Sequence, residues 1–226
     1  MSVTYNGHTF ERLGHASVRI TTSNDQIVYI DPWTEVLADR EPHDAAIVFV
    51  THDDFDHYDP DAIERVSTDE TTIVAYEGVD TSDLVGAEAV WSLSHDEELT
   101  VDGSTVQAIP AYNRADGNHV DENGIPFHAQ GEVIGLWLSI EGAVVYFASD
   151  TDFLDEHKDL SDTVDVFIPP IGGHYTMDRH EAAAFAERLD PALVLPVHYD
   201  TFEAIETDAD SFKQEVETTG STVQLF

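Results

Sequence analysis

The feature that most constrains this 226-residue chain is a short segment dense in His and Asp, residues 51–59, with the sequence THDDFDHYD. It follows an apolar run at residues 45–50, which predicts a buried strand. It leads into a predicted helix at residues 59–67, in which Asp59 is suited to the N-cap and Pro60 to the first helical position. A loop between a buried strand and a helix presents its side chains from a rigid scaffold, and such loops carry function.

Four residues of this loop, His52, Asp54, Asp56 and His57, are potential metal ligands within six positions and can face two cations at once. Loop-borne His and Asp at this spacing suit Zn²⁺ or Mn²⁺. The alternative is a merely acidic loop in an acidic protein, but its position after a buried strand disfavours that interpretation. The chain has no cysteine, so His, Asp and Glu must supply any metal ligands.

The rest of the chain predicts strands mixed with helices in one α/β domain spanning residues 1–226, since no linker-like segment divides it. Strands are expected at residues 8–13, 16–21, 26–30, 45–50, 72–76, 88–93, 105–111, 133–140, 143–147, 164–168, 193–197 and 222–225. Further helices are expected at 178–189 and 208–218, with a short one near 82–85. The order of the strands in a sheet does not follow from the sequence.

The charge is extreme, with 46 acidic residues against 9 basic ones and a formal net charge of -37. The acids are spread along the chain, which indicates a salt-loving organism, a halophilic archaeon, whose cytoplasm screens them; the Debye length falls to about 3 Å at 1 M salt. The alternative is an acid-rich protein of a mesophile. The charge disfavours nucleic acid and anionic membranes as partners. No apolar run reaches the roughly 20 residues that span a membrane, and residues 1–10 lack the pattern of a signal peptide, so we expect a cytoplasmic protein.

Several motifs resemble those of the metallo-β-lactamase superfamily, in the same order along the chain. The loop resembles its His-x-His-x-Asp-His signature, with Asp54 in place of the second histidine. LGHAS, IDPW, SDT, PPIGGHYTM and PVHY, which begin at residues 13, 30, 149, 169 and 196, resemble the branch that includes the L-ascorbate 6-phosphate lactonases and many uncharacterised hydrolases. The resemblance covers nearly the whole chain and implies a four-layered αββα sandwich with the site at strand ends along one edge.

The resemblance also implies a two-metal site and a ligand for each position in it. The expected ligands are His52, Asp54 and His128 for the first metal, Asp56, His57 and His198 for the second, and Asp150 bridging both. The alternative to His128 is His119. We favour His128 because the strand predicted at 133–140 fixes its position, whereas His119 lies in a Gly/Asn loop.

The carboxylate at position 54 changes the expected metal chemistry. With Asp56 and Asp150 it brings three negative charges to two divalent cations, which lowers their Lewis acidity and raises the pKa of a bound water. Zn²⁺ is the expected metal, and the harder first site suits Mn²⁺ or Fe better than an all-histidine site does.

Other residues are candidates for supporting roles. His174 is expected to hydrogen-bond the substrate or leaving group, with a plain surface histidine as the alternative. His15 is expected to be structural or to support a ligand, and Asp31 to orient a metal-bound histidine. Gly117, Asn118 and His119 resemble the Gly-Asn-His of dinuclear phosphoesterases, but that family needs a Gly-Asp motif earlier in the chain, and Asp150 comes later.

The expected activity is hydrolysis of a small ester or lactone by a water activated between two divalent metal ions, with Asp56 receiving the proton. One alternative is a phosphodiesterase, including one that processes RNA, which the charge and the lack of a Lys/Arg cluster disfavour. The other is a non-catalytic metal-bound sensing module, which the complete ligand set disfavours.

Overall fold

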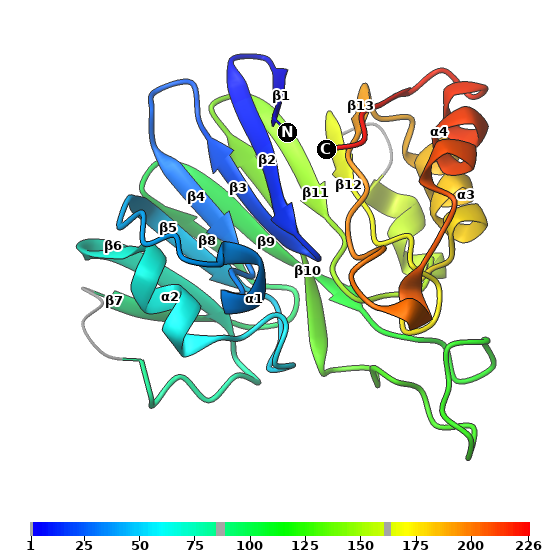
Figure 1. Ribbon diagram of the computed structural model, residues 1–226, viewed down its shortest axis with the longest axis horizontal. Coiled ribbons are helices and arrows are strands. Elements are labelled where there is room, and N and C mark those ends of the chain that lie inside the picture. The colour runs from blue at the N-terminus through cyan, green and yellow to red at the C-terminus, as the bar shows by residue number, and fades with distance from the viewer. Residues whose placement is uncertain (1, 85–88, 161–163) are drawn as a thin grey trace.

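The computed structural model describes residues 2–84, 89–160 and 164–226. In these residues two mixed β-sheets face each other, and each carries helices on its outer side (Figure 1). Helices α1 (Thr34–Leu37) and α2 (Pro60–Val66) pack on the first sheet, and α3 (Arg179–Leu189) and α4 (Ala209–Glu217) on the second. The strand and helix pattern predicted this α/β class, and the family resemblance implied the four-layered sandwich.

The first sheet comes from the N-terminal part of the chain and has the order β1-β2-β3-β4-β5-β6-β7. Its strands are β1 (Ser2–Tyr5), β2 (His8–Gly14), β3 (Ser17–Thr21), β4 (Ile27–Ile30), β5 (Ala45–Val50), β6 (Ser67–Tyr76) and β7 (Ala89–Leu93). Neighbours are antiparallel from β1 to β4 and parallel from β4 to β7.

The second sheet comes from the C-terminal part and repeats the pattern, in the order β14-β13-β12-β11-β10-β9-β8. Its strands are β8 (Glu98–Val101), β9 (Ser104–Ala111), β10 (Val133–Ile140), β11 (Ala143–Phe147), β12 (Val166–Ile168), β13 (Leu193–Val194) and β14 (Thr222–Val223). The first four are antiparallel and the last four parallel, with β11 common to both sets.

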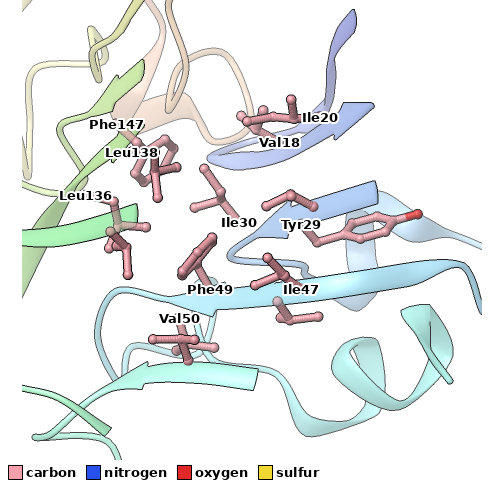
Figure 2. Packing of buried hydrophobic residues seen from close by; sticks show 14 of the residues in the cluster. Val18, Ile20, Tyr29, Ile30, Ile47, Phe49, Val50, Leu136, Leu138 and Phe147 are labelled. Atoms are coloured by element: carbon pink, nitrogen blue, oxygen red, sulfur yellow. The ribbon is translucent and has the colours of Figure 1, made fainter. Parts of the chain in front are cut away.

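The main core fills the space between the sheets. Figure 2 shows Ile30 and Phe49 of the first sheet pointing toward Leu136 and Phe147 of the second. Successive side chains of a strand point to opposite faces, so Tyr146, next to Phe147, packs on the helical side. There it meets Phe185 of α3 at a ring-centroid distance of 5.9 Å.

The three longer helices begin where the sequence predicts. The side chain of Asp59 accepts hydrogen bonds from the backbone N–H groups of Asp61 and Ala62, and Asp178 and Asp208 cap α3 and α4 in the same way. Such caps satisfy N–H groups that the first turn of a helix leaves without partners. The described helices have eleven residues or fewer, too few to cross a bilayer.

Some expected elements need correction. The strand predicted at 193–197 ends at Val194, because Pro196 has no N–H to continue a ladder, although Leu195 and Val197 still donate to the carbonyls of Phe167 and Pro169. The short helix near 82–85 is wrong for residues 82–84, which form a turn, and residue 85 lies outside the described residues. Residue 88, the expected start of β7, also lies outside them.

Strand β4 is parallel to β5 in the first sheet, β11 and β13 are parallel to β12 in the second, and β4, β5, β11 and β13 end at one edge of the sandwich. The segments that follow them contain, in order, Asp31, the His/Asp loop at 51–59, Asp150 and His198. Side chains at the carboxyl ends of parallel strands meet over the same crevice, which is where α/β sheets bind ligands.

Candidate metal centre

Asp150 is the carboxylate at which the histidines of this edge meet. Its oxygens lie 3.4 Å from Nε2 of His57, 3.5 Å from Nε2 of His128 and 3.2 Å from Nε2 of His198. The residue is almost completely buried. A buried carboxylate shared by three histidine nitrogens is suited to bridging two cations.

Two groups of potential ligands lie on either side of Asp150. The open group contains His52, Asp54 and His128, with Asp54 Oδ2 lying 3.6 Å from His52 Nε2 and 3.3 Å from His128 Nε2. The rings of His52 and His128 are 5.6 Å apart between centroids. The donor atoms of these three residues all lie within 4.8 Å of one another, close enough to share one ion.

The closed group contains Asp56, His57 and His198. Their donor atoms, together with those of His15, also lie within 4.8 Å of one another. The His57 and His198 rings stack at 5.7 Å. All four residues are buried, whereas the Asp54 side chain of the open group is 51% exposed. The structure thus brings together every residue expected to bind metal.

The donor set fits divalent cations. Nε2 of His52 and Nε2 of His57 are buried and have no hydrogen-bond partner, which is costly unless something else binds them. The N···O separations of 3.2–3.6 Å around Asp150 and Asp54 exceed those of charge-assisted hydrogen bonds, about 2.7–2.9 Å. Two ligands of one ion, each about 2.0–2.2 Å from it, are separated by distances of this size.

Electrostatics favour cation binding at the same place. Burial alone would lower the pKa of His57, but the charges of Asp150 and Asp31 outweigh it and raise that pKa to about 10. Burial alone would raise the pKa of Asp150, but the facing His198 and His57 hold it well below its usual range. The facing imidazoles of His128 and, to a lesser extent, His52 lower the pKa of Asp54 strongly. The carboxylates are therefore ionised and surrounded by positive charge, which metal ions would supply in place of protons.

Asp31 orients the closed group, the role that the sequence analysis proposed for it. Its Oδ2 accepts from Nδ1 of His57 at 2.8 Å and from the Thr51 hydroxyl at 2.7 Å, while Oδ1 accepts from the Thr51 N–H. Because the Thr51 hydroxyl donates to Asp31, Nδ1 of His52 donates to Thr51 across 2.9 Å. Both histidines are thereby held with Nε2 toward the site, as supporting partners of metal-bound histidines do.

His15 supports the closed group from behind. Burial lowers its pKa to about 4, so its ring is neutral at pH 7. Its Nε2 donates to Oδ2 of Asp56 at 2.8 Å, which leaves the other carboxylate oxygen free. The ring also lies 4.1 Å from that of His198.

Asn113 and Asp152 hold the open group, and no sequence pattern marked them. The Asn113 side-chain oxygen accepts from the backbone N–H of His128 at 2.9 Å and lies 3.1 Å from its Nδ1. Asp152 accepts from the Asn113 amide at 3.0 Å and lies 2.6 Å from Nδ1 of His119. His119, the alternative ligand, therefore lies in a separate group with Asp152 and Glu181.

The backbone is strained where it delivers these side chains. His15, Asp31, Ser149 and His198 all have φ between 45° and 58°, the left-handed region that residues other than glycine rarely adopt. Each such residue costs about 1–3 kcal/mol, and such strain concentrates at functional sites. Gly172 allows the neighbouring segment to approach, because a Cβ there would lie 2.4 Å from the His198 carbonyl oxygen.

The centre opens into a cavity of about 380 Å³. Asp54, Asp56, His128, Asp150 and His198 line it together with Phe55, Phe127, Tyr175 and Phe202. His174, the other expected catalytic residue, is exposed and is not among the lining residues; its ring packs on Phe127 at 5.2 Å and on Tyr175 at 4.5 Å.

Known proteins resemble this chain in sequence and in fold. A family model described as Beta-lactamase superfamily domain matches residues 9–198. A UPF0173 metal-dependent hydrolase of Methanosphaerula palustris is 33% identical over 208 residues, 91% of this chain and 90% of the relative. One from Methanopyrus kandleri is 31% identical over 220 residues, 94% and 93% of the two chains.

Among solved structures, the metallo hydrolase Igni18 of Ignicoccus hospitalis has a TM-score of 0.77 at 24% identity, covering 96% of this chain and 94% of its own. At that identity the likeness concerns the fold. The family model extends over the strands and loops that carry His15, Asp31, the 51–59 segment, Asp150 and His198. The chain belongs to the β-lactamase superfamily.

Proposed function

We propose that this protein is a metal-dependent hydrolase that opens a small ester or lactone at a two-cation centre. The observation that carries the proposal is the position of Asp150, within 3.5 Å of histidines from both ligand groups, at the floor of one cavity. The family and the names of the relatives support hydrolysis.

The open and closed groups would each hold one divalent ion, with Asp150 shared between them. Zn²⁺ is the expected ion, and Asp54 makes Mn²⁺ or Fe an alternative at the open group. When bound, such ions polarise a carbonyl oxygen and lower the pKa of a water molecule to near neutrality.

The residues of the chain supply positioning and proton transfer. Asp31, Thr51 and Asn113 hold the histidine rings in place, so that the ligand atoms need not reorganise. Asp56 lines the cavity and keeps one carboxylate oxygen free of His15, so this residue is suited to receive the proton of the attacking water. The exposed position of His174 outside the lining favours the surface role over contact with the leaving group.

The test is turnover of a generic lactone and a generic phosphodiester by protein stripped with a chelator and reloaded with Zn²⁺, Mn²⁺ or Fe²⁺. We expect lactone hydrolysis that requires metal and exceeds phosphodiester hydrolysis. Faster hydrolysis of the phosphodiester would favour a phosphodiesterase instead. Metal binding without turnover of either would favour a non-catalytic sensing module.

We further propose that the chain works in a salt-rich cytoplasm. With 46 acidic and 9 basic residues, repulsion between like charges opposes the folded state in dilute buffer, and salt reduces it. The thermal midpoint should therefore rise between dilute buffer and molar KCl. Metal occupancy must be held constant, because bound metal also stabilises the fold. A flat or falling midpoint would contradict a salt adaptation.

A further inference from the structure

Two aromatic clusters contribute residues to the lining of the cavity at the metal centre. In the first, the ring of Trp33 lies 5.9 Å from that of Phe55 and 6.0 Å from that of Phe202. In the second, Phe127 lies 5.0 Å from Tyr175. Phe55, Phe202, Phe127 and Tyr175 all line the cavity. We call these four residues the aromatic wall.

Two rings of the aromatic wall are exposed to solvent, although exposure of large apolar side chains does not stabilise the fold. Phe55 is 68% and Phe202 38% exposed, on the surface of a protein with 46 acidic residues. In the described residues only three other large apolar side chains are comparably exposed: Val90, Trp91 and Ile125. Exposed apolar side chains gathered at a cavity that also holds polar groups indicate a ligand-binding surface.

The described residues that line the cavity include carboxylates but no permanently cationic side chain. Among the described residues that line it there is no Lys or Arg, while Asp54, Asp56 and Asp150 are present. The guanidinium of Arg12 reaches the loop after His198, but it donates to the carbonyls of His15 and Tyr199 and stacks on the Tyr199 ring at 3.9 Å. A phosphate on the substrate away from the metals would meet carboxylates and aromatic rings, without the bidentate donors that bind phosphate.

We propose that the substrate is an uncharged ester or lactone that carries an aromatic or similarly bulky apolar group next to the reacting carbonyl, and that it is not a phosphorylated sugar. The proposal rests on the proposed hydrolytic function of the same site. The aromatic wall stacks on the apolar group, since ring pairs prefer centroid separations of about 4.5–7 Å. The volume of about 380 Å³ lies near the lower end of the range for small-molecule sites.

The experiment compares two matched pairs of lactones on the metal-loaded protein. The first pair is α-phenyl-γ-butyrolactone, whose phenyl group is on the carbon next to the carbonyl, and γ-butyrolactone, which lacks the phenyl group. The second is glucono-δ-lactone and its 6-phosphate, which differ by the charge. We expect kcat/KM, corrected for spontaneous hydrolysis, to be at least roughly tenfold higher with the ring and several-fold lower with the phosphate.

Variants locate the effect. Phe127→Ala and Phe202→Ala should reduce the preference for the phenyl lactone over its ring-free partner by roughly tenfold, without loss of bound metal. Trp91→Ala, which removes an exposed aromatic ring from β7, is the matched control and should keep the preference. Equal loss on both lactones in the wall variants, or a preference for the phosphorylated lactone, would overturn the proposal.

A binding measurement separates failure of this inference from failure of the proposed function. Benzamide, which is neutral and aromatic, should show saturation transfer by NMR from the metal-loaded protein, and the signal should weaken in Phe127→Ala and persist in Trp91→Ala. Benzamide binding with no lactone turnover would support the aromatic wall and contradict the proposed hydrolysis of lactones. Lactone turnover with no preference for the phenyl lactone and no benzamide binding would support the proposed hydrolysis and contradict the role of the aromatic wall.

Discussion

The two ligand groups of the metal centre share Asp150 but are built differently. In the closed group Asp56, His57 and His198 are all buried and are backed by Asp31 and His15. In the open group the Asp54 side chain is 51% exposed. Asp54 and His128 also line both the main cavity and a second cavity of about 360 Å³.

This difference predicts that the two groups bind their ions with different affinities. Buried ligands with fixed hydrogen-bond partners form a rigid site that reorganises little when an ion binds. An exposed carboxylate that lines two cavities can move, and water or substrate can take its place on the ion. We therefore expect the closed group to hold its ion more tightly and the open group to lose its ion first to a chelator.

The largest effect should come from Asp150→Asn, which removes the carboxylate common to both groups. Both ions should be lost, and activity should fall by at least about 1000-fold, or about 4 kcal/mol of transition-state stabilisation. Metal content by mass spectrometry and lactone turnover are the measurements. Asp116→Asn, at a carboxylate that is 88% exposed, is the control. Retention of one ion at full occupancy would mean that Asp150 belongs to one group alone.

The pH dependence should separate the groups. Without metal, the pKa of His57 is raised to about 10, so an ion entering the closed group below pH 10 must displace a proton. Affinity there should rise about tenfold per pH unit, or about 100-fold from pH 7 to 9. The pKa of His128 is also raised, but by less, so affinity at the open group should level off at lower pH. Titrations with a competing chelator would measure both slopes, and equal slopes would contradict the comparison.

Supporting residues should act on one group more than the other. Asn113→Ala frees the ring of His128 and should weaken metal binding at the open group by about 10- to 100-fold. Asp31→Asn should weaken metal binding at the closed group by a similar factor. It should also weaken the open group, but less, because Asp31 reaches His52 only through Thr51. Stepwise metal titration distinguishes the two, and similar losses at both groups in both variants would show that the groups are not independent.

Much of this architecture could be predicted from local sequence. Strand β5 ends where its apolar run ends, and α2 begins at Asp59 and Pro60, because an apolar run and a cap are local signals. Strands β1 and β8 were not predicted: Ser2–Tyr5 and Glu98–Val101 have only four residues each, two of them polar, and lie at sheet edges. Their place depends on pairing with β2 and β9, which no local pattern specifies.

The site likewise contains residues that local sequence predicts and residues that it does not. The 51–59 segment is contiguous, so its ligands could be predicted directly, whereas His128, Asp150 and His198 were expected only through the family resemblance. Asn113 and Asp152 were missed, because a residue that orients another side chain does not have to stand at a fixed number of positions from it in the sequence. Their roles arise from the tertiary fold, which places Asn113 beside His128, 15 residues away.

The smallest expected effect tests the carboxylate that sets the open group apart. Asp54→His replaces an exposed oxygen ligand by the imidazole that the superfamily signature has at this position, and imidazole favours Zn²⁺ over harder ions. We expect the preference for Zn²⁺ over Mn²⁺ at the open group to rise by about tenfold, or about 1.4 kcal/mol, with the closed group unchanged. Asp53→His, at the adjacent exposed position, is the control for adding a histidine to the loop. The measurement is competition between the two metals at each site, followed by mass spectrometry and by the Mn²⁺ paramagnetic resonance signal. If both variants leave the preference unchanged, Asp54 is not a ligand, and the open group depends on His52, His128 and Asp150 alone.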